Sequence, residues 1–230
     1  MNTYNIDMAC VNAFSGAITN DDLSQVLKTH QSRLMGFAWI EKPLEEEMAV
    51  KELDDAVNNL GFKGLKLHPG VQGFNPADPK IYPLIKKAAE LRIPIFIHMF
   101  PWPLGTFHFY KPENIAILKK NVRDATIILG HMVPQHFMEL EILLWEPGIF
   151  VETSFGLEMI ANLYGLDFAE KWLRRIGINK IVFGSDWMGT QDGDERIADN
   201  NLKIYDQMNL TQEEKNKILG ENIKGIMELD

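Results

Sequence analysis

IPIFIHMF, residues Ile93 to Phe100, is the stretch from which the fold of this chain is best inferred. A proline stands at the start of the run, apolar β-favouring residues follow, and the polar residue near its end is His98, which can bind a metal or move a proton. A single histidine that closes a strand is more often a hydrogen-bonded core residue than a ligand. The pattern recurs, however: GLKLH ends at His68, ATIILGH at His131 and KIVFGSD at Asp186. This repetition favours a functional use of these side chains.

The composition of the chain limits the classes of protein to which it can belong. Its 230 residues, 46% of them hydrophobic and 24% charged, suffice for one large core, so one domain over residues 1–230 is expected. The net charge of -9 argues against nucleic acid and membrane surfaces as partners, since both attract clustered Lys and Arg. The single cysteine, Cys10, cannot form an internal disulfide, and no signal peptide or membrane-spanning run is recognised. We expect a soluble cytoplasmic protein whose partner is a small-molecule substrate.

Short apolar runs alternate with amphipathic segments along the whole chain. The runs begin near residues 6, 34, 62, 93, 125, 148 and 180, at spacings close to the ~30 residues of one βαβ unit. Between them we expect helices, one with Asn20 as its N-cap, one beginning at Pro43, and a last one opened by a capping box from Thr211 to Glu214. Such near-continuous hydrophobic runs are typical of parallel strands covered by helices.

Two α/β folds fit this alternation, a (β/α)8 barrel and an open doubly wound sheet. No glycine-rich nucleotide-binding motif follows the first run, and polar residues close several runs instead of marking one switch point. The barrel is therefore favoured, although a barrel has eight strands and seven runs are counted.

Four motifs resemble one enzyme family. The stretch GFKGLKLHPGVQGFNPADPKIYPLIKKAAELRIPIFIHM, residues 61–99, is similar to the middle of the amidohydrolase-related family. This is the branch of the metal-dependent TIM-barrel hydrolases that also contains aminocarboxymuconate-semialdehyde-type decarboxylases. ILGHM and IVFGSDW resemble two later strands of the family, and LGENIKGIM resembles its C-terminal helix. The resemblance covers essentially the whole chain and implies a TIM barrel.

The resemblance also implies roles for the residues at the strand ends. His98 becomes a metal ligand, His131 contacts the substrate or the metal-bound water, and Asp186 ligates the metal and accepts a proton. Imidazole and carboxylate groups suit zinc, with manganese as the other candidate, and such a metal would activate a water molecule.

Further residues near the strand ends are candidates for substrate contacts. Aromatic side chains after strand ends can form the wall of a mostly apolar pocket, although packing of a loop explains them equally well. Two interpretations of His68 are equally supported, a residue that lines the pocket and a purely structural one, because Pro69 follows it directly. The expected substrate-binding residues are His68, Phe100, Trp102 and Trp187.

One motif of the family has no counterpart here. The family's first strand carries a His-x-His or Glu-x-His pair, and nothing before Ile6 resembles it. We therefore expect an α/β fold of the (β/α)8 TIM-barrel type that lacks its first β/α unit. Three explanations are open: the chain is truncated, it is a family member that lost its metal, or another subunit covers the gap. His98 and Asp186 alone give two ligands where a catalytic zinc has three, so the occupancy of the metal should be low. Two open sheet edges would favour a homodimer.

These observations lead to one main expectation of function and two alternatives. The main expectation is a metal-dependent hydrolase that attacks a small carboxylated or cyclic substrate with a metal-activated water. The alternatives are a non-oxidative decarboxylase (a lyase) of the same family and a non-catalytic barrel that has lost the metal site.

Overall fold

The computed structural model describes residues 1–103, 105–187 and 194–229, and these residues form two compact units. Unit 1 comprises Met1–Phe109 with Glu113–Ile127, and unit 2 comprises Tyr110–Pro112 with Ile128–Asp230. The expectation of one domain over residues 1–230 stays a prediction.

Unit 1 is a parallel sheet whose strand order follows the chain. Its strands are β1 (Ala9–Asn12), β2 (Leu34–Trp39), β3 (Gly64–Leu67) and β4 (Ile95–Ile97), followed by the first residue of β5 (Ile127–Leu129). The register pairs Ala9 with Leu34, Phe37 with Gly64, and Leu65 with Ile95. Its α-helices are α1 (Asn20–Thr29), α2 (Glu46–Asn58), α3 (Pro69–Gln72), α4 (Tyr82–Glu90) and α5 (Pro112–Asn121). Three short 3-10 helices complete it: η1 (Asn2–Tyr4), η2 (Pro79–Ile81) and η3 (Phe107–Tyr110).

The helices of unit 1 begin close to the predicted residues but not at them. The N-cap of α1 is Thr19, whose hydroxyl oxygen accepts the backbone N–H of Asp22 at 3.1 Å, so the prediction of Asn20 is wrong by one residue. Asn20 instead bonds the backbone of Trp39, with its amide nitrogen donating to the carbonyl at 2.7 Å. Likewise α2 begins at Glu46 and not at Pro43.

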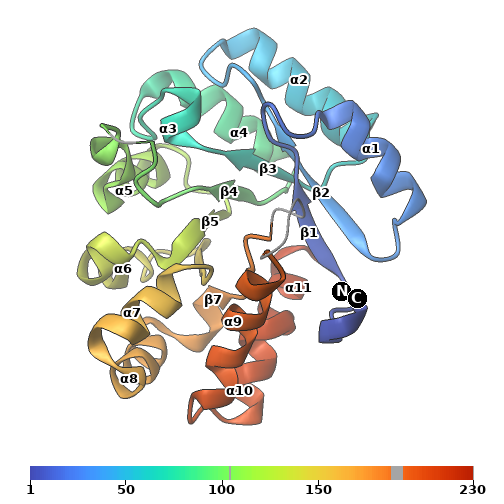
Figure 1. Ribbon diagram of the computed structural model, residues 1–230. Helices are drawn as coiled ribbons and strands as arrows, with labels where there is room; N and C mark the ends of the chain where they lie inside the picture. Colours follow the sequence, from blue (N-terminus) through green and yellow to red (C-terminus); the bar gives the residue numbers. More distant parts are fainter. Residues whose placement is uncertain (104, 188–193, 230) are drawn as a thin grey trace. The chain divides into compact units, whose positions relative to one another are not determined.

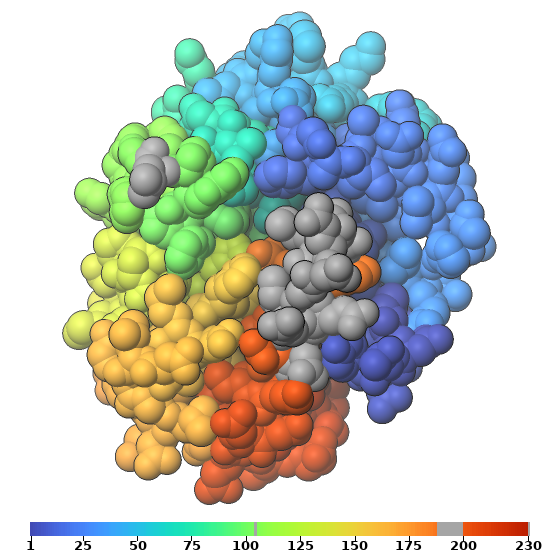
Figure 2. Space-filling view, viewed as in Figure 1, coloured from blue at the N-terminus to red at the C-terminus, as the bar shows by residue number. Residues whose placement is uncertain are grey.

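A cluster of buried apolar side chains joins α1 and α2 to β2. Figure 1 shows these helices along one side of the strands of unit 1, and Figure 2 shows their outward side chains at the surface. The cluster comprises Ala13, Leu23, Leu27, Ala38, Trp39, Ala56 and Phe62. A Cβ atom at Gly36 in β2 would collide with Leu27 and Phe62, so glycine is what permits this close packing.

Unit 2 contains the remainder of β5, then β6 (Ile149–Glu152) and β7 (Ile181–Val182). β6 and β7 are parallel, with Val151 opposite Ile181. The α-helices are α6 (Phe137–Leu143), α7 (Gly156–Tyr164), α8 (Leu166–Ile176), α9 (Asp194–Gln207), α10 (Gln212–Asn216) and α11 (Asn222–Ile226). Short turns of helix are η4 (Gly130–Met132), η5 (Pro134–His136), η6 (Ile178–Lys180) and a π-helical turn η7 (Lys217–Glu221).

The alternation of runs and helices is confirmed in both units. Each of the seven apolar runs contains one strand, although every strand is shorter than its run. The capping box is present, with Thr211 and Glu214 bonding each other's backbone N–H groups. None of the helices within the described ranges is long and apolar enough to cross a membrane.

Candidate functional site

Two histidines and a tryptophan meet at the carboxyl end of unit 1's strands. His68 directly follows β3 and His98 directly follows β4, and the backbone N–H of His98 still bonds the carbonyl of Leu67 at 2.9 Å. The two imidazole rings stack with their centroids 3.8 Å apart and their planes 13° apart. The indole of Trp102 lies edge-on to His68 at 5.9 Å. Neighbouring parallel strands end side by side, and this brings the two histidines together.

His68 is buried and serves as a helix cap. Its ring Nδ1 accepts the backbone N–H of Val71 at 3.3 Å, and the backbone N–H of His68 donates to the side-chain oxygen of Gln72 at 2.6 Å. Burial lowers the pKa of His68 to about 3, with the charge of Lys66 as the second cause. A neutral, capped imidazole with its lone pair directed at Val71 is therefore suited to packing and not to proton transfer near pH 7.

His98 is half-buried, and its ring is oriented by the backbone two residues ahead. Its Nε2 lies 2.8 Å from the carbonyl oxygen of Phe100. A carbonyl oxygen can only accept, so Nε2 carries the hydrogen in this contact and the neutral ring has its lone pair on Nδ1. The side chain of Phe100 is half-buried, whereas Trp102 is 57% exposed.

His131 is the buried histidine of unit 2 and lies in a strained turn. It follows β5 and is 3% exposed, and it has a positive φ of 64°, as do Met132 (54°) and Val133 (46°). Residues other than glycine rarely adopt such φ values, and each costs of order 1–3 kcal/mol and persists only where the surrounding structure imposes it. The backbone N–H of His131 donates to Glu152 Oε2 at 3.1 Å, and its ring Nδ1 lies 2.9 Å from the Ser154 hydroxyl.

Glu152, at the end of β6, is the centre of this arrangement and was not singled out in the sequence. Besides His131, its carboxylate accepts the Ser154 backbone N–H at 2.6 Å and the Ser154 hydroxyl at 2.8 Å. Burial raises the pKa of Glu152 to about 7 even though these three donors favour its charged form. The available signal was the run GIFVETS, residues 148–154, which is another apolar run that closes on a carboxylate.

Asp186 and Trp187 follow β7 and are exposed. Asp186 has a positive φ of 49°, and Trp187 is 58% exposed with its backbone N–H 3.3 Å from the Ser185 hydroxyl. A Cβ atom on Gly184 would collide with Glu152 Oε1, so the glycine of the GSDW motif lets the segment leading to Asp186 pass beside that carboxylate.

Whether a metal ion can bind depends on which His, Cys, Asp and Glu side chains come together. Across the described ranges, no group of three or more His, Cys, Asp or Glu side chains could hold a metal ion. The two expected ligands, His98 and Asp186, belong to different units. The residues described therefore do not make a three-ligand zinc or manganese site.

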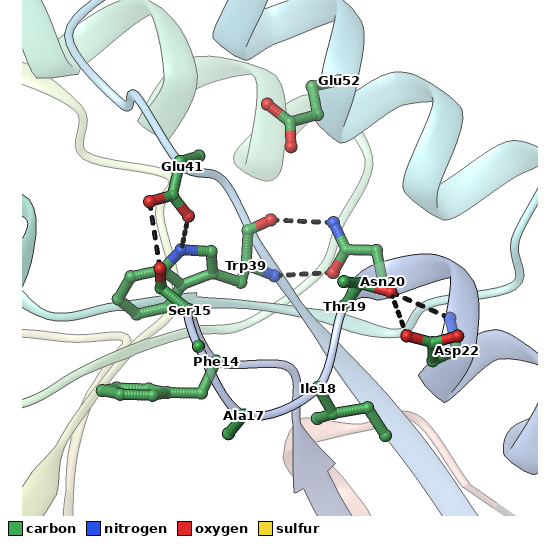
Figure 3. Close-up of a pocket in the computed structure, with 11 residues that line it drawn as sticks. Phe14, Ser15, Ala17, Ile18, Thr19, Asn20, Asp22, Trp39, Glu41 and Glu52 are labelled. Carbon is green, nitrogen blue, oxygen red and sulfur yellow. Dashed lines mark hydrogen bonds between the residues drawn. The ribbon is translucent and has the colours of Figure 1, made fainter.

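A cavity of about 340 Å³ lies in unit 1 beside the cluster of histidines (Figure 3). Its wall is formed by the loop after β1, the end of β2 and one side chain of α2, and includes Phe14, Trp39, Glu41 and Glu52. The Phe14 ring lies 4.8 Å from Trp39 and 6.0 Å from His68, so it joins this wall to the imidazole stack.

The electrostatics of the cavity disfavour an anionic ligand. Glu41 accepts the Trp39 indole N–H at 2.7 Å and the Ser15 hydroxyl at 3.0 Å, as Figure 3 shows. Partial burial, and second the charge of Glu41, raise the pKa of Glu52. None of the four predicted substrate-binding residues lines this cavity, and their role stays a prediction.

Alternating strands and helices, with polar side chains collected at the carboxyl ends of strands, define an α/β protein of the TIM-barrel class. Comparison with known proteins gives the family. The amidohydrolase family model (Amidohydro_2) matches residues 7–224, and the chain belongs to this family. The resemblance inferred from the four motifs is thereby confirmed.

Two curated relatives are enzymes that act on small carboxylated compounds. A 2-amino-3-carboxymuconate-6-semialdehyde decarboxylase from Dictyostelium discoideum is 29% identical over 86 residues, which are 37% of this chain and 23% of that protein. The match thus spans about a quarter of that relative's length. A 2-keto-4-carboxy-3-hexenedioate hydratase from Sphingobium sp. is 22% identical over 90% of this chain and 69% of its own length.

Solved structures show the same fold. A TIM-barrel protein from Bordetella bronchiseptica has a TM-score of 0.82 at 16% identity, covering 99% of this chain and 80% of its own. A dihydroxybenzoic acid decarboxylase from Polaromonas sp., solved with manganese and the inhibitor 2-nitroresorcinol, has a TM-score of 0.74 at 17% identity, covering 99% and 83%. The TIM-barrel type predicted from the sequence is therefore confirmed. The named relatives fit the decarboxylase alternative better than the main expectation of a hydrolase.

Proposed function

We propose that this protein is a non-oxidative decarboxylase acting on a small carboxylated aromatic compound. The support is its membership of the amidohydrolase family together with the two decarboxylases among the relatives described above. In such a reaction the bond between the ring carbon and the carboxylate breaks and carbon dioxide leaves. The electron pair stays on the ring carbon, which must then receive a proton.

The observation that carries the proposal is the buried imidazole of His131. This ring is 3% exposed and is held by Ser154 within a turn that Glu152 fixes. A histidine held rigidly and out of bulk water is suited to keep a proton at a defined position and to transfer it. We assign to His131 the proton that reaches the ring carbon, and Asp186 is proposed as a second catalytic group that accepts a proton.

Unit 1 offers a surface that suits an aromatic ring. The half-buried His98 ring, stacked on the buried His68, and the exposed indole of Trp102 give flat contact area, which aromatic ligands favour. We propose His68 and Trp102 as substrate contacts, with Phe100 and Trp187 as further candidates. The cavity beside His68 carries Glu41 and Glu52 and would repel a carboxylated substrate.

Hydration of a double bond is the second candidate. The hydratase from Sphingobium sp. aligns with 90% of this chain, more than the decarboxylase from Dictyostelium discoideum does. Adding water across a carbon–carbon double bond also delivers a proton to carbon, so His131 would have the same role.

A substrate panel tests the proposal. The purified protein is incubated with dihydroxybenzoic acids and with unsaturated dicarboxylic acids, with and without added Mn²⁺, and carbon dioxide and products are quantified. We expect carbon dioxide from at least one aromatic acid and a loss of at least about 100-fold in His131→Asn, since general acid–base catalysis contributes that much. His136→Asn is the matched control, because the ring of His136 is partly exposed and contacts the exposed carboxylate of Glu139.

Two results would contradict the decarboxylase. One is full turnover by His131→Asn, and the other is the absence of carbon dioxide from every acid in either condition. Water addition to a dicarboxylic acid without release of carbon dioxide would favour the hydratase.

Metal analysis tests the proposed cofactor independently of any substrate. We propose zinc or manganese as the cofactor, with His98 and Asp186 each as a candidate ligand. Its occupancy should be low, because a catalytic site normally has three protein ligands. Well under one equivalent per chain is expected in the purified protein. One equivalent that survives dialysis against a chelator would overturn the expectation of a weak site.

A further inference from the structure

We infer that Glu152 and Ser154 are positioning residues that hold His131 in its Nδ1–H tautomer, so that Nε2 is the nitrogen that exchanges protons with a substrate. The inference deepens the proposed function, on which it rests, by naming the reactive nitrogen and the residues that select it.

The tautomer of His131 follows from the donor and acceptor roles of the Ser154 hydroxyl. The hydroxyl has one hydrogen and two neighbours, Glu152 Oε2 at 2.8 Å and His131 Nδ1 at 2.9 Å. An ionised carboxylate can only accept, so the hydroxyl hydrogen belongs to Glu152. The hydroxyl oxygen is then left as an acceptor for His131, and Nδ1 must be the donor.

A second contact points the same way. The backbone carbonyl oxygen of Ser154 lies 3.3 Å from His131 Nδ1 and can only accept. With the lone pair on Nδ1, that nitrogen would face the lone pairs of this carbonyl. These two contacts of Nδ1 therefore favour a hydrogen on it, which in the neutral ring leaves the lone pair on Nε2.

The backbone around this network is shaped to keep it in place. Glu152 also accepts the backbone N–H groups of His131 and Ser154, which fixes the carboxylate on both sides. Gly156 and Gly184 leave the space, because a Cβ at Gly156 would collide with the His131 carbonyl oxygen and one at Gly184 with Glu152 Oε1. Five hydrogen bonds within a buried cluster thus determine the orientation of one imidazole.

Ionised Glu152 has a further effect on this ring. When His131 takes up a second proton at Nε2, the imidazolium is linked through the Ser154 hydroxyl to a buried negative charge. This charge favours the protonated ring without contacting the substrate, so Glu152 is a positioning residue and not a catalytic one.

Nitrogen-15 NMR of protein labelled only at histidine tests the inference without any substrate. The chain has six histidines, and the signal lost in His131→Asn identifies the ring of interest. At a pH where Glu152 is ionised, we expect wild-type His131 to show Nδ1–H over Nε2–H by about tenfold or more, the ratio that one net hydrogen bond gives. A dominant Nε2–H tautomer in the wild type would overturn the inference, and this result needs no variant to fold.

Variants separate positioning from mere structural support. Glu152→Gln introduces an amide that can donate to the hydroxyl, and Ser154→Ala removes the hydroxyl, so both should lower the Nδ1–H fraction several-fold. Matched controls remove the same groups elsewhere in unit 2. Glu170→Gln alters a buried carboxylate bonded to the Asn209 N–H, and Tyr205→Phe removes a buried hydroxyl bonded to Thr153. Both controls should keep the wild-type tautomer.

The outcomes distinguish this inference from the proposed function. An unchanged tautomer in both Glu152→Gln and Ser154→Ala, with intact circular dichroism, would show that these residues do not select it. Lack of decarboxylation with the Nδ1–H tautomer present would refute the function and leave the positioning role of Glu152 standing. Decarboxylation by a wild-type protein with the Nε2–H tautomer would refute the positioning role alone.

Discussion

The contribution of Glu152 to the stability of this protein should fall as the pH rises through the range in which its carboxyl group ionises, and Glu152→Gln should remove that contribution. The carboxyl pKa is raised from 4.5 to about 7, chiefly by burial. A group whose pKa is higher in the folded state binds more protons there, so between about pH 4.5 and 7 the free energy of unfolding decreases with increasing pH.

The size of the effect follows from the two pKa values. Each pH unit between 4.5 and about 7 corresponds to about 1.4 kcal/mol, so full ionisation of Glu152 lowers the free energy of unfolding by about 3 kcal/mol. His68 acts in the opposite direction, because its pKa is lowered from 6.5 to about 3 and its contribution to stability rises with pH in that interval. The wild-type curve alone is therefore nearly uninformative.

The informative quantity is the difference between the wild type and Glu152→Gln at each pH. Urea unfolding, followed by tryptophan fluorescence and far-UV circular dichroism, gives free energies wherever the two transitions coincide. We expect this difference to change by about 3 kcal/mol between pH 4.5 and 7.5, in favour of the variant at high pH. Glu214→Gln is the control: the pKa of Glu214 is lowered from 4.5 to about 2, so its contribution to stability is constant above pH 4.5 and changes with pH only below that value. A pH-independent difference between wild type and Glu152→Gln would refute the reasoning.

Other predictions concern the space and the charges around the two histidine clusters. Gly184→Ala should destabilise by about 1–3 kcal/mol, since its Cβ displaces Glu152, whereas Gly225→Ala in α11 meets no atom within 4 Å and should be neutral or slightly stabilising in thermal unfolding. Lys66→Met should raise the pKa of His68, measured by NMR titration, because the positive charge of Lys66 lowers it. The pKa should still lie below 6.5, because burial is the larger cause, and a value at or above 6.5 would contradict that ranking.

The sequence was sufficient for the repeating architecture and for part of the site. Seven apolar runs at the spacing of βαβ units each produced a strand, because burial on both faces of a parallel sheet demands such runs. The meeting of His68 and His98 was predictable for the same reason, since both directly follow neighbouring parallel strands.

The remainder of the site depends on backbone geometry that the sequence does not reveal. Three successive residues from His131 adopt positive φ values, although none is glycine, and this turn brings the His131 N–H to Glu152. Residue preferences favour extended or helical values for histidine, methionine and valine, so no local signal predicts such a turn. The carboxylate of Glu152 was visible at the end of an apolar run, but its partners were not.

The two histidines that follow β4 and β5 differ in which nitrogen carries the lone pair, and this difference limits what each can do. His98 donates from Nε2 to the Phe100 carbonyl, so its lone pair is on Nδ1, whereas His131 donates from Nδ1 and has its lone pair on Nε2. A metal or a proton reaches a neutral imidazole only at its lone pair. For His98 to bind a metal through Nε2, the 2.8 Å contact with Phe100 would have to break, which costs about one hydrogen bond. If Mn²⁺ binds His98 and the Nε2–H signal of that ring stays intact, the ion is on Nδ1. If the Nε2–H signal disappears, the contact with Phe100 has been exchanged for the metal.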